Sequence, residues 1–276
     1  MTHPDGTPIP TLPDLRFTEV AGRRMSWMEA GSGAPVLLMH GIGANSTGWR
    51  FVLPALDARV IAWNAPGYML SDPFADEAPS AEDYADAAIW LLDALGVSAP
   101  THIVGSSFGS MLGAALAARH PHRVATLTLL GTSRGQRWKG AEGRAQMLAM
   151  RTASIAKGGV ALARTRWQAL VAPGTGEVVG DLVRTMVSAT DVRGLMPAAR
   201  CTDAVDVIAD FAPAIHAPTL VVTGTEDRVN PPDVGASIAA AIAGAAFVSP
   251  EGVGHLPELE APALTIGLLR GHLRIG

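Results

Sequence analysis

The five residues GSSFG at positions 105–109 decide the fold, because they lie where a strand-like pattern ends and a helix-like pattern begins. The apolar run at 102–104 precedes them, and the run MLGAALAA at 111–118 follows them. At such a sharp junction only glycine fits two positions before and two positions after the serine, because a side chain there would collide with neighbouring backbone. The stretch therefore predicts a nucleophile elbow with Ser107 at its apex.

Ser106 is a competing candidate, but Val104 and Phe108 occupy the positions where a nucleophile at 106 would need glycine. A glycine-serine turn of this kind also occurs in chains without a catalytic serine, so the motif needs further support. A serine hydroxyl is a poor nucleophile unless a histidine accepts its proton and an acid orients that histidine. A nucleophile at position 107 therefore requires an aspartate and a histidine elsewhere in the chain.

Two loops after later strand patterns supply such an acid and such a base. The β-branched run at 219–223 leads into a polar loop with Asp227, and residues 246–249 precede a glycine-bounded loop with His255. Glu226 is a rival acid, but we expect it to point the other way from the end of the strand. The order nucleophile, acid, base supports Ser107, Asp227 and His255 as one catalytic set.

Strand and helix patterns alternate along most of the chain. Strands are expected at residues 16–20, 23–29, 36–39, 60–63, 102–104, 124–130, 219–223 and 246–249, with a hairpin turn at 21–22. Helical patterns include residues 81–95 and 107–119. The alternation predicts an α/β fold with a mostly parallel eight-stranded sheet flanked by helices, and a site at the carboxyl ends of the strands.

Residues 134–200 interrupt this alternation, because they join two neighbouring strands with far more residues than one crossover helix needs. We expect a helical cap after the sixth strand, inserted into a core of residues 1–133 and 201–276 and not an independent domain. Eleven Lys and Arg against four Asp and Glu give the cap a charge of +7, whereas the whole chain carries −4. A basic cap favours anionic substrates, but pairing with the acidic core explains each single arginine as well. Trp138 and Trp167 are candidate pocket walls or else the local core of the cap.

Composition narrows the class of protein. A chain of 276 residues with 48% hydrophobic content is large enough for one sizeable core. The single Cys201 excludes an internal disulfide and fits a reducing compartment. Without an apolar run of about eighteen residues or a signal-like start, we expect a cytoplasmic protein with no membrane partner. A pI near 6.0 disfavours a nucleic-acid partner. Association of the chain into a homo-oligomer is compatible with the sequence.

Taken together, the motifs resemble the α/β-hydrolase superfamily over nearly the whole chain. They are HGIG at 40–43 with Trp49 downstream, NAPGYMLSD at 64–72, the elbow, the Gly-x-x-Asp pattern at 224–227 and GH at 254–255. The resemblance implies an oxyanion hole made by the backbone N–H groups of Ile42 and Phe108, with Gly41 beside the substrate. It leaves His40 a structural role within its loop.

One motif departs from the pattern Asp-x-Pro-Gly-x-Gly-x-Ser of the family. Asn64 replaces the aspartate, and Met69 replaces the second glycine. This loop lies beside the active site in the family, so the change bears on the substrate more than on the fold. Met69 is accordingly a candidate pocket residue that narrows the site.

Within the superfamily, the cap and its flanks look most like 3-oxoadipate enol-lactonases. The similar residues are GTSR at 131–134, GGVALA at 158–163 before RW at 166–167, and Gly194 with ARC at 199–201. This resemblance implies a small lactone or ester that bears carboxylates, although that group tends to carry Leu-Ser-Met at the elbow. Carbon–carbon bond hydrolases of ring-cleavage products typically carry Ser-Gly-x-Gly in the first loop and Asn before the nucleophile, and neither is present here.

The sequence thus predicts a serine hydrolase that cleaves a small carboxylic ester or lactone through an acyl-enzyme on Ser107, with no metal and no cofactor. Three alternatives remain. They are a carbon–carbon bond hydrolase, a cofactor-free perhydrolase or haloperoxidase-like enzyme with the same three residues, and a ligand-binding member of the fold without turnover.

Overall fold

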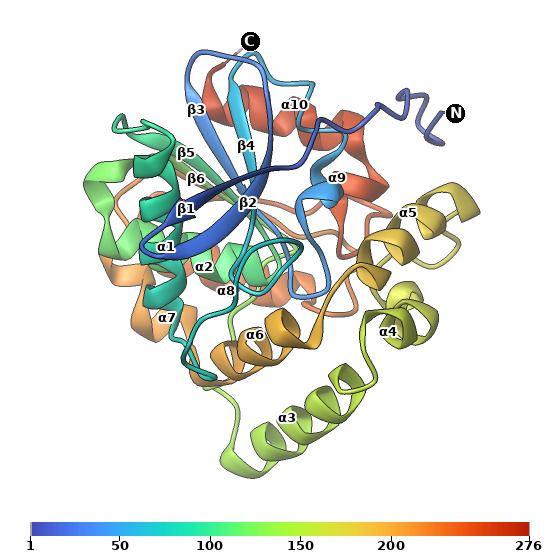
Figure 1. Cartoon of the computed structure of the whole chain (residues 1–276). Helices are drawn as coiled ribbons and strands as arrows, with labels where there is room; N and C mark the ends of the chain where they lie inside the picture. Colours follow the sequence, from blue (N-terminus) through green and yellow to red (C-terminus); the bar gives the residue numbers. More distant parts are fainter. Residues whose placement is uncertain (1, 276) are drawn as a thin grey trace.

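The computed structural model describes residues 2–275, and its strands within that range form one eight-stranded sheet in the order β1-β2-β4-β3-β5-β6-β7-β8 (Figure 1). The strands are β1 (Arg16–Val20), β2 (Arg23–Ala30), β3 (Pro35–Met39), β4 (Arg59–Asn64), β5 (Thr101–Ser106), β6 (Val124–Leu130), β7 (Thr219–Val222) and β8 (Ala246–Val248). β2 runs antiparallel to both β1 and β4, and all other neighbours are parallel. The mostly parallel sheet expected from the sequence is confirmed.

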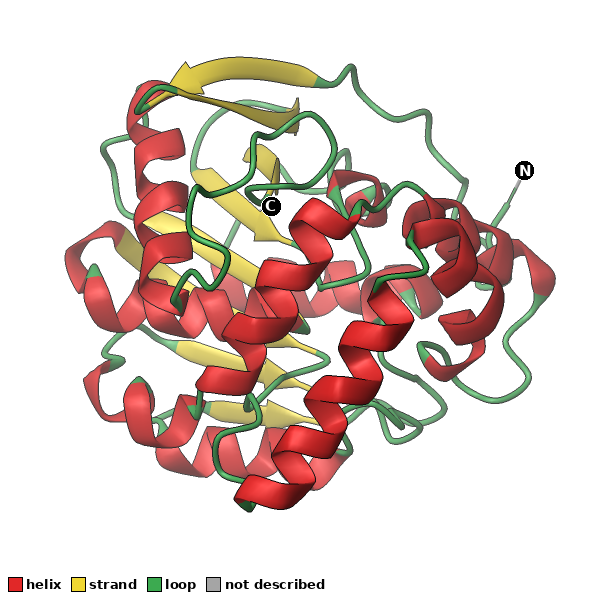
Figure 2. Ribbon diagram, turned by 60° about the horizontal axis from the view of Figure 1, so that its bottom comes forward, coloured by secondary structure: helices red, strands yellow, loops and turns green. Residues whose placement is uncertain are grey.

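Helices flank this sheet (Figure 2). They are α1 (Ala81–Ala94), α2 (Phe108–Arg119), α3 (Ala141–Ile155), α4 (Gly159–Arg166), α5 (Glu177–Ser188), α6 (Val192–Ala204), α7 (Val207–Asp210), α8 (Pro232–Ala241), α9 (Pro257–Glu260) and α10 (Pro262–Leu273), with a 3₁₀ turn η1 (Ser46–Trp49). α1 begins at a reciprocal capping box of Ser80 with Asp83 and ends before Gly96, whose φ is +71°. In the described part of the chain, no helix is both long enough and apolar enough to cross a membrane.

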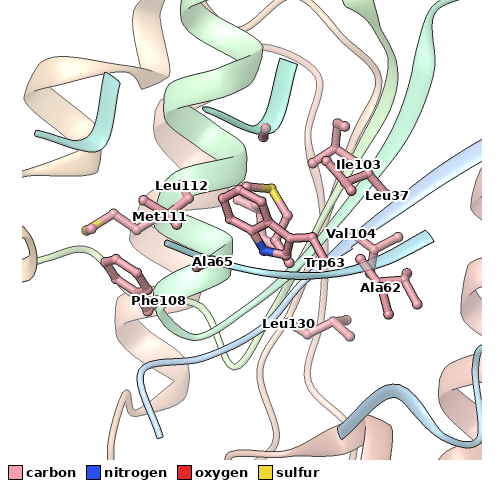
Figure 3. Packing of buried hydrophobic residues seen from close by; sticks show 14 of the residues in the cluster. Leu37, Ala62, Trp63, Ala65, Ile103, Val104, Phe108, Met111, Leu112 and Leu130 are labelled. Atoms are coloured by element: carbon pink, nitrogen blue, oxygen red, sulfur yellow. The ribbon is translucent and has the colours of Figure 1, made fainter. Parts of the chain in front are cut away.

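The central strands form the rigid base of the molecule. β3, β4, β5 and β7 are buried at nearly every position, as expected for parallel strands that are covered on both faces. Leu37 of β3 lies opposite Ile103 of β5, and Figure 3 shows both near Trp63 and Leu112 in the core. Loops that leave the carboxyl ends of these strands are therefore anchored in a close-packed interior.

Along the chain, the helices α3 to α6 come between β6 and β7, and in Figure 1 they lie along the bottom and the right-hand side of the molecule. The expected boundary at residue 200 falls inside α6, which continues to Ala204. The helical insert therefore comprises residues 134–204. Ion pairs join the helical insert to the rest of the chain. Arg134 at its start pairs with Asp206, which follows its end, and Arg200 pairs with Glu77 of the core.

The helical insert also packs closely against loops at the ends of the strands. A Cβ atom on Gly67 would lie 2.7 Å from the Cα of Gly194, so α6 and the loop after β4 meet backbone to backbone. A Cβ atom on Gly48 would lie 2.8 Å from Met186 Sδ, which places α5 on η1. The helical insert thus lies over the loops that follow β3 and β4.

Candidate active site

Ser107 occupies a strained turn between β5 and α2. Its φ of 53° and ψ of −114° are unfavourable for a residue with a side chain, and such strain is found mainly where the surrounding structure enforces it. The two neighbouring glycines show how tight the turn is. A Cβ atom on Gly105 would lie 2.2 Å from Gly109 O, and one on Gly109 would lie 1.9 Å from Met39 O. The steric argument made from the sequence therefore holds at both glycines.

The structure brings Ser107, His255 and Asp227 together, although they are far apart in the sequence. Ser107 Oγ lies 2.9 Å from His255 Nε2, and His255 Nδ1 lies 2.8 Å from Asp227 Oδ2. His255 and Asp227 are buried, whereas Ser107 is partly exposed. The two rival residues face elsewhere: Glu226 is exposed, and the Ser106 hydroxyl donates to Glu258.

Asp227 is fixed in the orientation that the histidine needs. Its Oδ1 accepts the backbone N–H groups of Val229 and Asn230, both at 2.9 Å, so Oδ2 is left for His255. A carboxylate can only accept a hydrogen bond, and His255 Nδ1 is therefore the donor. Nε2 is then the unprotonated nitrogen of the neutral ring and accepts the hydroxyl proton of Ser107. This arrangement is able to move a proton away from Ser107.

The histidine loop is held between the helical insert and the end of β6. Gly131 has a φ of +49°, and a Cβ atom there would lie 2.4 Å from His255 O, so only glycine lets β6 end this close to the histidine. On the other side, Glu260 accepts the backbone N–H groups of Ala172, Gly254 and Leu256 at 2.7, 3.1 and 3.0 Å. Neither Gly131 nor Glu260 was expected from the sequence to support the site.

The loop after β3 lies against Ser107. A Cβ atom on Gly41 would be 3.1 Å from Ser107 Cβ, so this glycine allows the close approach. Tyr68 donates its hydroxyl to Ile42 O at 2.8 Å and thereby fixes the backbone of the loop. Phe108 begins α2, where the first N–H groups have no carbonyl partner within the helix, and its side chain is buried in the core (Figure 3).

His40 serves this loop through hydrogen bonds. Its Nε2 accepts the backbone N–H of Ala65 at 3.1 Å, so Nδ1 carries the proton and donates to Gly41 O at 2.8 Å. Complete burial lowers the pKa of His40 to about 4, against the opposing effect of its hydrogen bond to Gly41. The ring is thus neutral near pH 7 and holds the loops after β3 and β4 together, which agrees with the structural role expected for it.

The two departures from the family pattern have different consequences. Asn64 is fully buried; its Oδ1 accepts from Ser46 N at 2.8 Å, and its Nδ2 donates to Ser26 Oγ at 3.0 Å. The amide therefore joins β4 to η1 and β2. Met69 is partly buried and adopts a φ of +49°, a left-handed conformation that glycine tolerates much better than methionine does.

The cations of the helical insert divide into paired and unpaired groups. Six arginines form ion pairs with carboxylates: Arg134, Arg137, Arg144, Arg184, Arg193 and Arg200. Within residues 2–275, no ion pair includes Lys139, Arg151, Lys157, Arg164 or Arg166. Burial and the nearby charge of Arg166 lower the pKa of Arg151, against the opposing effect of Asp203.

The two tryptophans of the helical insert lie in different surroundings. Trp138 is 44% exposed, and its ring packs against the guanidinium of Arg134 at 4.9 Å from the ring centre. Trp167 contacts Arg184 at 4.6 Å and lines a cavity of about 420 Å³ together with Arg228. The lining of this cavity includes neither Ser107 nor His255. That either tryptophan contacts a substrate remains a prediction.

Comparison with known proteins places this geometry in a family. Residues 34–262 match the family described as alpha/beta hydrolase fold. The chain is 38% identical over 118 residues to a 2-hydroxymuconate semialdehyde hydrolase of Pseudomonas sp. (strain CF600). This alignment covers 41% of the chain and 41% of that protein, so it spans well under half of the relative.

Two solved structures resemble the chain over almost its whole length. A thermophilic esterase from Thermogutta terrifontis has a TM-score of 0.82 at 25% identity, with 96% of this chain and 98% of that one covered. The enol-lactonase from Burkholderia xenovorans LB400 has a TM-score of 0.83 at 26% identity, with 94% and 100% covered. The family match spans the strands and loops that carry Ser107, Asp227 and His255, and this chain therefore belongs to the alpha/beta hydrolase family.

Proposed function

We propose that the protein is a serine hydrolase that cleaves a small carboxylic ester or lactone through an acyl-enzyme on Ser107. The observation that carries this proposal is the continuous hydrogen-bonded chain from Ser107 Oγ through His255 to Asp227 Oδ2, with links of 2.9 and 2.8 Å. The strained backbone of Ser107 and its partial exposure to solvent support the role of nucleophile.

In the proposed mechanism, Ser107 Oγ attacks the carbonyl carbon while His255 Nε2 takes the hydroxyl proton. Asp227 stabilises the resulting imidazolium. The backbone N–H groups of Ile42 and Phe108 hold the oxyanion, a contribution of about 3 to 4 kcal/mol for one donor. The imidazolium then gives its proton to the leaving alkoxide, and His255 activates a water molecule that releases the acid from Ser107.

The test is hydrolysis of p-nitrophenyl butyrate by the parent protein and by Ser107→Ala. We expect the variant to lose activity by about a thousandfold or more while its circular dichroism spectrum is unchanged. Labelling with a fluorophosphonate, followed by mass spectrometry, gives a second measurement that needs no turnover. A parent that neither hydrolyses the ester nor carries a label on Ser107 would contradict the proposal.

Carbon–carbon bond hydrolysis is the second candidate, because the relative that is 38% identical over 118 residues is named a 2-hydroxymuconate semialdehyde hydrolase. Ser106 stands where such enzymes typically have Asn before the nucleophile, which favours the ester or lactone. Incubation with 2-hydroxymuconate semialdehyde separates the two candidates, since cleavage removes the conjugated absorbance of that compound. Faster turnover of the semialdehyde than of any ester would make carbon–carbon cleavage the main activity.

The unpaired cations of the helical insert support a substrate that bears a carboxylate, as the enol-lactonase resemblance implies. Arg151 is the cation to test, because it is partly buried and no described carboxylate pairs with it. An anionic group beside Arg151 would form a charge-assisted hydrogen bond with the guanidinium. We therefore expect this side chain to distinguish an anionic ester from a neutral one.

Two chromogenic esters of similar size measure that preference. For p-nitrophenyl hemisuccinate, we expect kcat/KM of Arg151→Gln to fall about tenfold, and for p-nitrophenyl butyrate we expect little change. Lys157→Gln is the matched control, because Lys157 is an exposed cation of the same helical insert. An equal loss on both esters would mean that Arg151 supports the fold and does not select the substrate.

A further inference from the structure

A buried hydrogen bond lies directly behind the candidate nucleophile. Ser106 Oγ donates to Glu258 Oε1 at 2.7 Å, and both residues are buried. Ser106 is the last residue of β5 and precedes Ser107, while Glu258 lies in α9, three residues after His255. This hydrogen bond therefore joins the strand that carries the nucleophile to the segment that carries the base.

The setting of Glu258 differs from that of its neighbour Glu260. Glu260 accepts three backbone N–H groups and so has a clear structural role. Glu258 Oε2 is also buried, but it has no hydrogen-bond partner among residues 2–275. Glu258 therefore lacks the structural hydrogen bonds to described residues that occupy both carboxyl oxygens of Glu260.

Burial determines the charge of Glu258. It raises the pKa of Glu258 to about 7, although the hydrogen bond from Ser106 and the charge of His255 act in the opposite direction. The side chain is therefore neutral in mild acid and becomes a carboxylate above about pH 7. Its charge changes in the pH range in which a histidine-assisted hydrolase operates.

Few other charges act on this carboxyl group. His255, once protonated, favours the carboxylate, and Glu260 opposes it. Two elements pack against α9 from the side of the helical insert and the first loop, namely α5 and η1. η1 has no titratable side chain, and Arg184 of α5 pairs with carboxylates of its own helix.

α10 packs against α9 on the remaining side and carries two basic residues, Arg270 and His272. Arg270 donates to Ala55 O, and His272 hydrogen-bonds to Leu127 O. His3 hydrogen-bonds to Leu259 O.

We infer that Glu258 is a second acidic positioning residue for His255, held in place by Ser106, and this inference rests on the proposed function. When Ser107 passes its proton to His255 Nε2, the imidazolium gains a positive charge. Asp227 stabilises that charge at Nδ1, and the carboxylate of Glu258 stabilises it from the side of α9. Glu258 itself takes up no proton in this step.

The pH dependence of kcat/KM separates this role from a structural one. We compare the parent with Glu258→Gln, which keeps an acceptor for Ser106 but has no charge, on p-nitrophenyl butyrate from pH 5.5 to 9. The ratio of parent to variant activity is expected to be near one at the acidic end and to rise to about tenfold above pH 8. Glu251→Gln is the matched control, because Glu251 is an exposed carboxylate near His255 in the sequence, and its ratio should stay near one throughout.

A ratio for Glu258→Gln that is the same at every pH, whether near one or large, would overturn the inference. Ser106→Ala provides an independent variant if Glu258→Gln does not fold. It keeps the carboxyl group but removes a hydrogen bond that lowers the pKa of Glu258, so the rise of activity in the parent should move to higher pH. An unmoved rise would also refute the role of Glu258.

A measurement without substrate distinguishes this inference from the proposed function. Carbon-13 NMR of labelled histidine, with the His255 signal assigned from His255→Gln, follows the imidazole directly. We expect the His255 ring of Glu258→Gln to lose its proton at lower pH than the ring of the parent does. Equal titration midpoints would refute the inference even in an active enzyme. A shift in a protein that does not hydrolyse esters would instead support the effect of Glu258 on His255 and contradict the proposed function.

Discussion

Two glycines of α2 provide the sharpest test of the steric reasoning about the elbow. Gly109 and Gly113 lie one helical turn apart, and the same change to alanine is made at each. A Cβ atom on Gly109 would lie 1.9 Å from Met39 O and 2.8 Å from His40 O, both backbone atoms. The nearest neighbours of a Cβ atom on Gly113 would be side-chain methyl groups, those of Ile103 and Leu127 at 3.3 Å and that of Leu129 at 3.9 Å.

The magnitudes follow from these contacts. Alanine is favoured over glycine in a helix interior by about 0.8 to 1 kcal/mol, a gain that applies at Gly113 but not in full at Gly109, the second residue of α2. At Gly113 the methyl groups have to move by only a few tenths of an ångström, so we expect Gly113→Ala to stay within about 1 kcal/mol of the parent. At Gly109 the end of β3 has to move, and overpacking of this kind costs about 1 to 3 kcal/mol or more. We therefore expect Gly109→Ala to lose about 2 kcal/mol, which corresponds to about 4 to 8 °C in Tm.

Thermal unfolding followed by circular dichroism measures both variants under the same conditions. Because Met39 O and His40 O lead into the loop that lies against Ser107, Gly109→Ala should also lose hydrolase activity well below its Tm, and Gly113→Ala should keep it. Equal Tm values for the two variants, or full activity of Gly109→Ala, would refute the steric account of the elbow.

Three further predictions concern the loops around the site. Met69→Gly should raise the free energy of unfolding by about 0.5 to 1 kcal/mol in a urea titration. The left-handed backbone is more costly for methionine than the additional entropy of the unfolded chain is for glycine. A lower free energy of unfolding than that of the parent would mean that the side-chain contacts of Met69 dominate. Asp227→Asn should lower kcat about 10,000-fold without unfolding, because an amide favours the wrong tautomer of His255; a loss below tenfold would remove Asp227 from the mechanism. His40 stays neutral in the folded protein down to about pH 4, whereas in the unfolded chain it takes up a proton near pH 6.5. The free energy of unfolding should therefore fall by up to about 3 kcal/mol as the pH is lowered from about 6.5 to about 4. In urea titrations, His40→Asn should lack this part of the pH dependence, and an unchanged slope would contradict the burial argument.

Much of the fold follows from local sequence patterns. The strands at 16–20 and 124–130 lie where the patterns predict them, and α2 begins one residue after the predicted start. Short-range rules suffice here, because strand and helix periodicity and the need for glycine at 105 and 109 depend on residues close in the chain. The order of Ser107, Asp227 and His255 after three strand ends was readable for the same reason, since parallel strands bring their carboxyl ends to one edge.

Contacts between distant segments could not be read from the sequence. Ser106 was considered only as a rival nucleophile, and its hydrogen bond to Glu258 joins residues 152 positions apart. A carboxylate three residues after the histidine was the available signal, but its burial is a property of packing. The pairing of Arg134 with Asp206 and the burial of Arg151 likewise depend on how the helical insert lies on the core.

The sequence by itself therefore determined the strand-turn-helix unit, the sheet and the order of the candidate catalytic residues, because local sterics and hydrophobic periodicity act within a few residues. Only the tertiary structure decided which oxygen of Asp227 faces His255, where each tryptophan of the helical insert lies, and which carboxyl groups are buried beside the site. These features depend on distances and desolvation among segments that meet only in the folded chain, and both change steeply with small differences in packing.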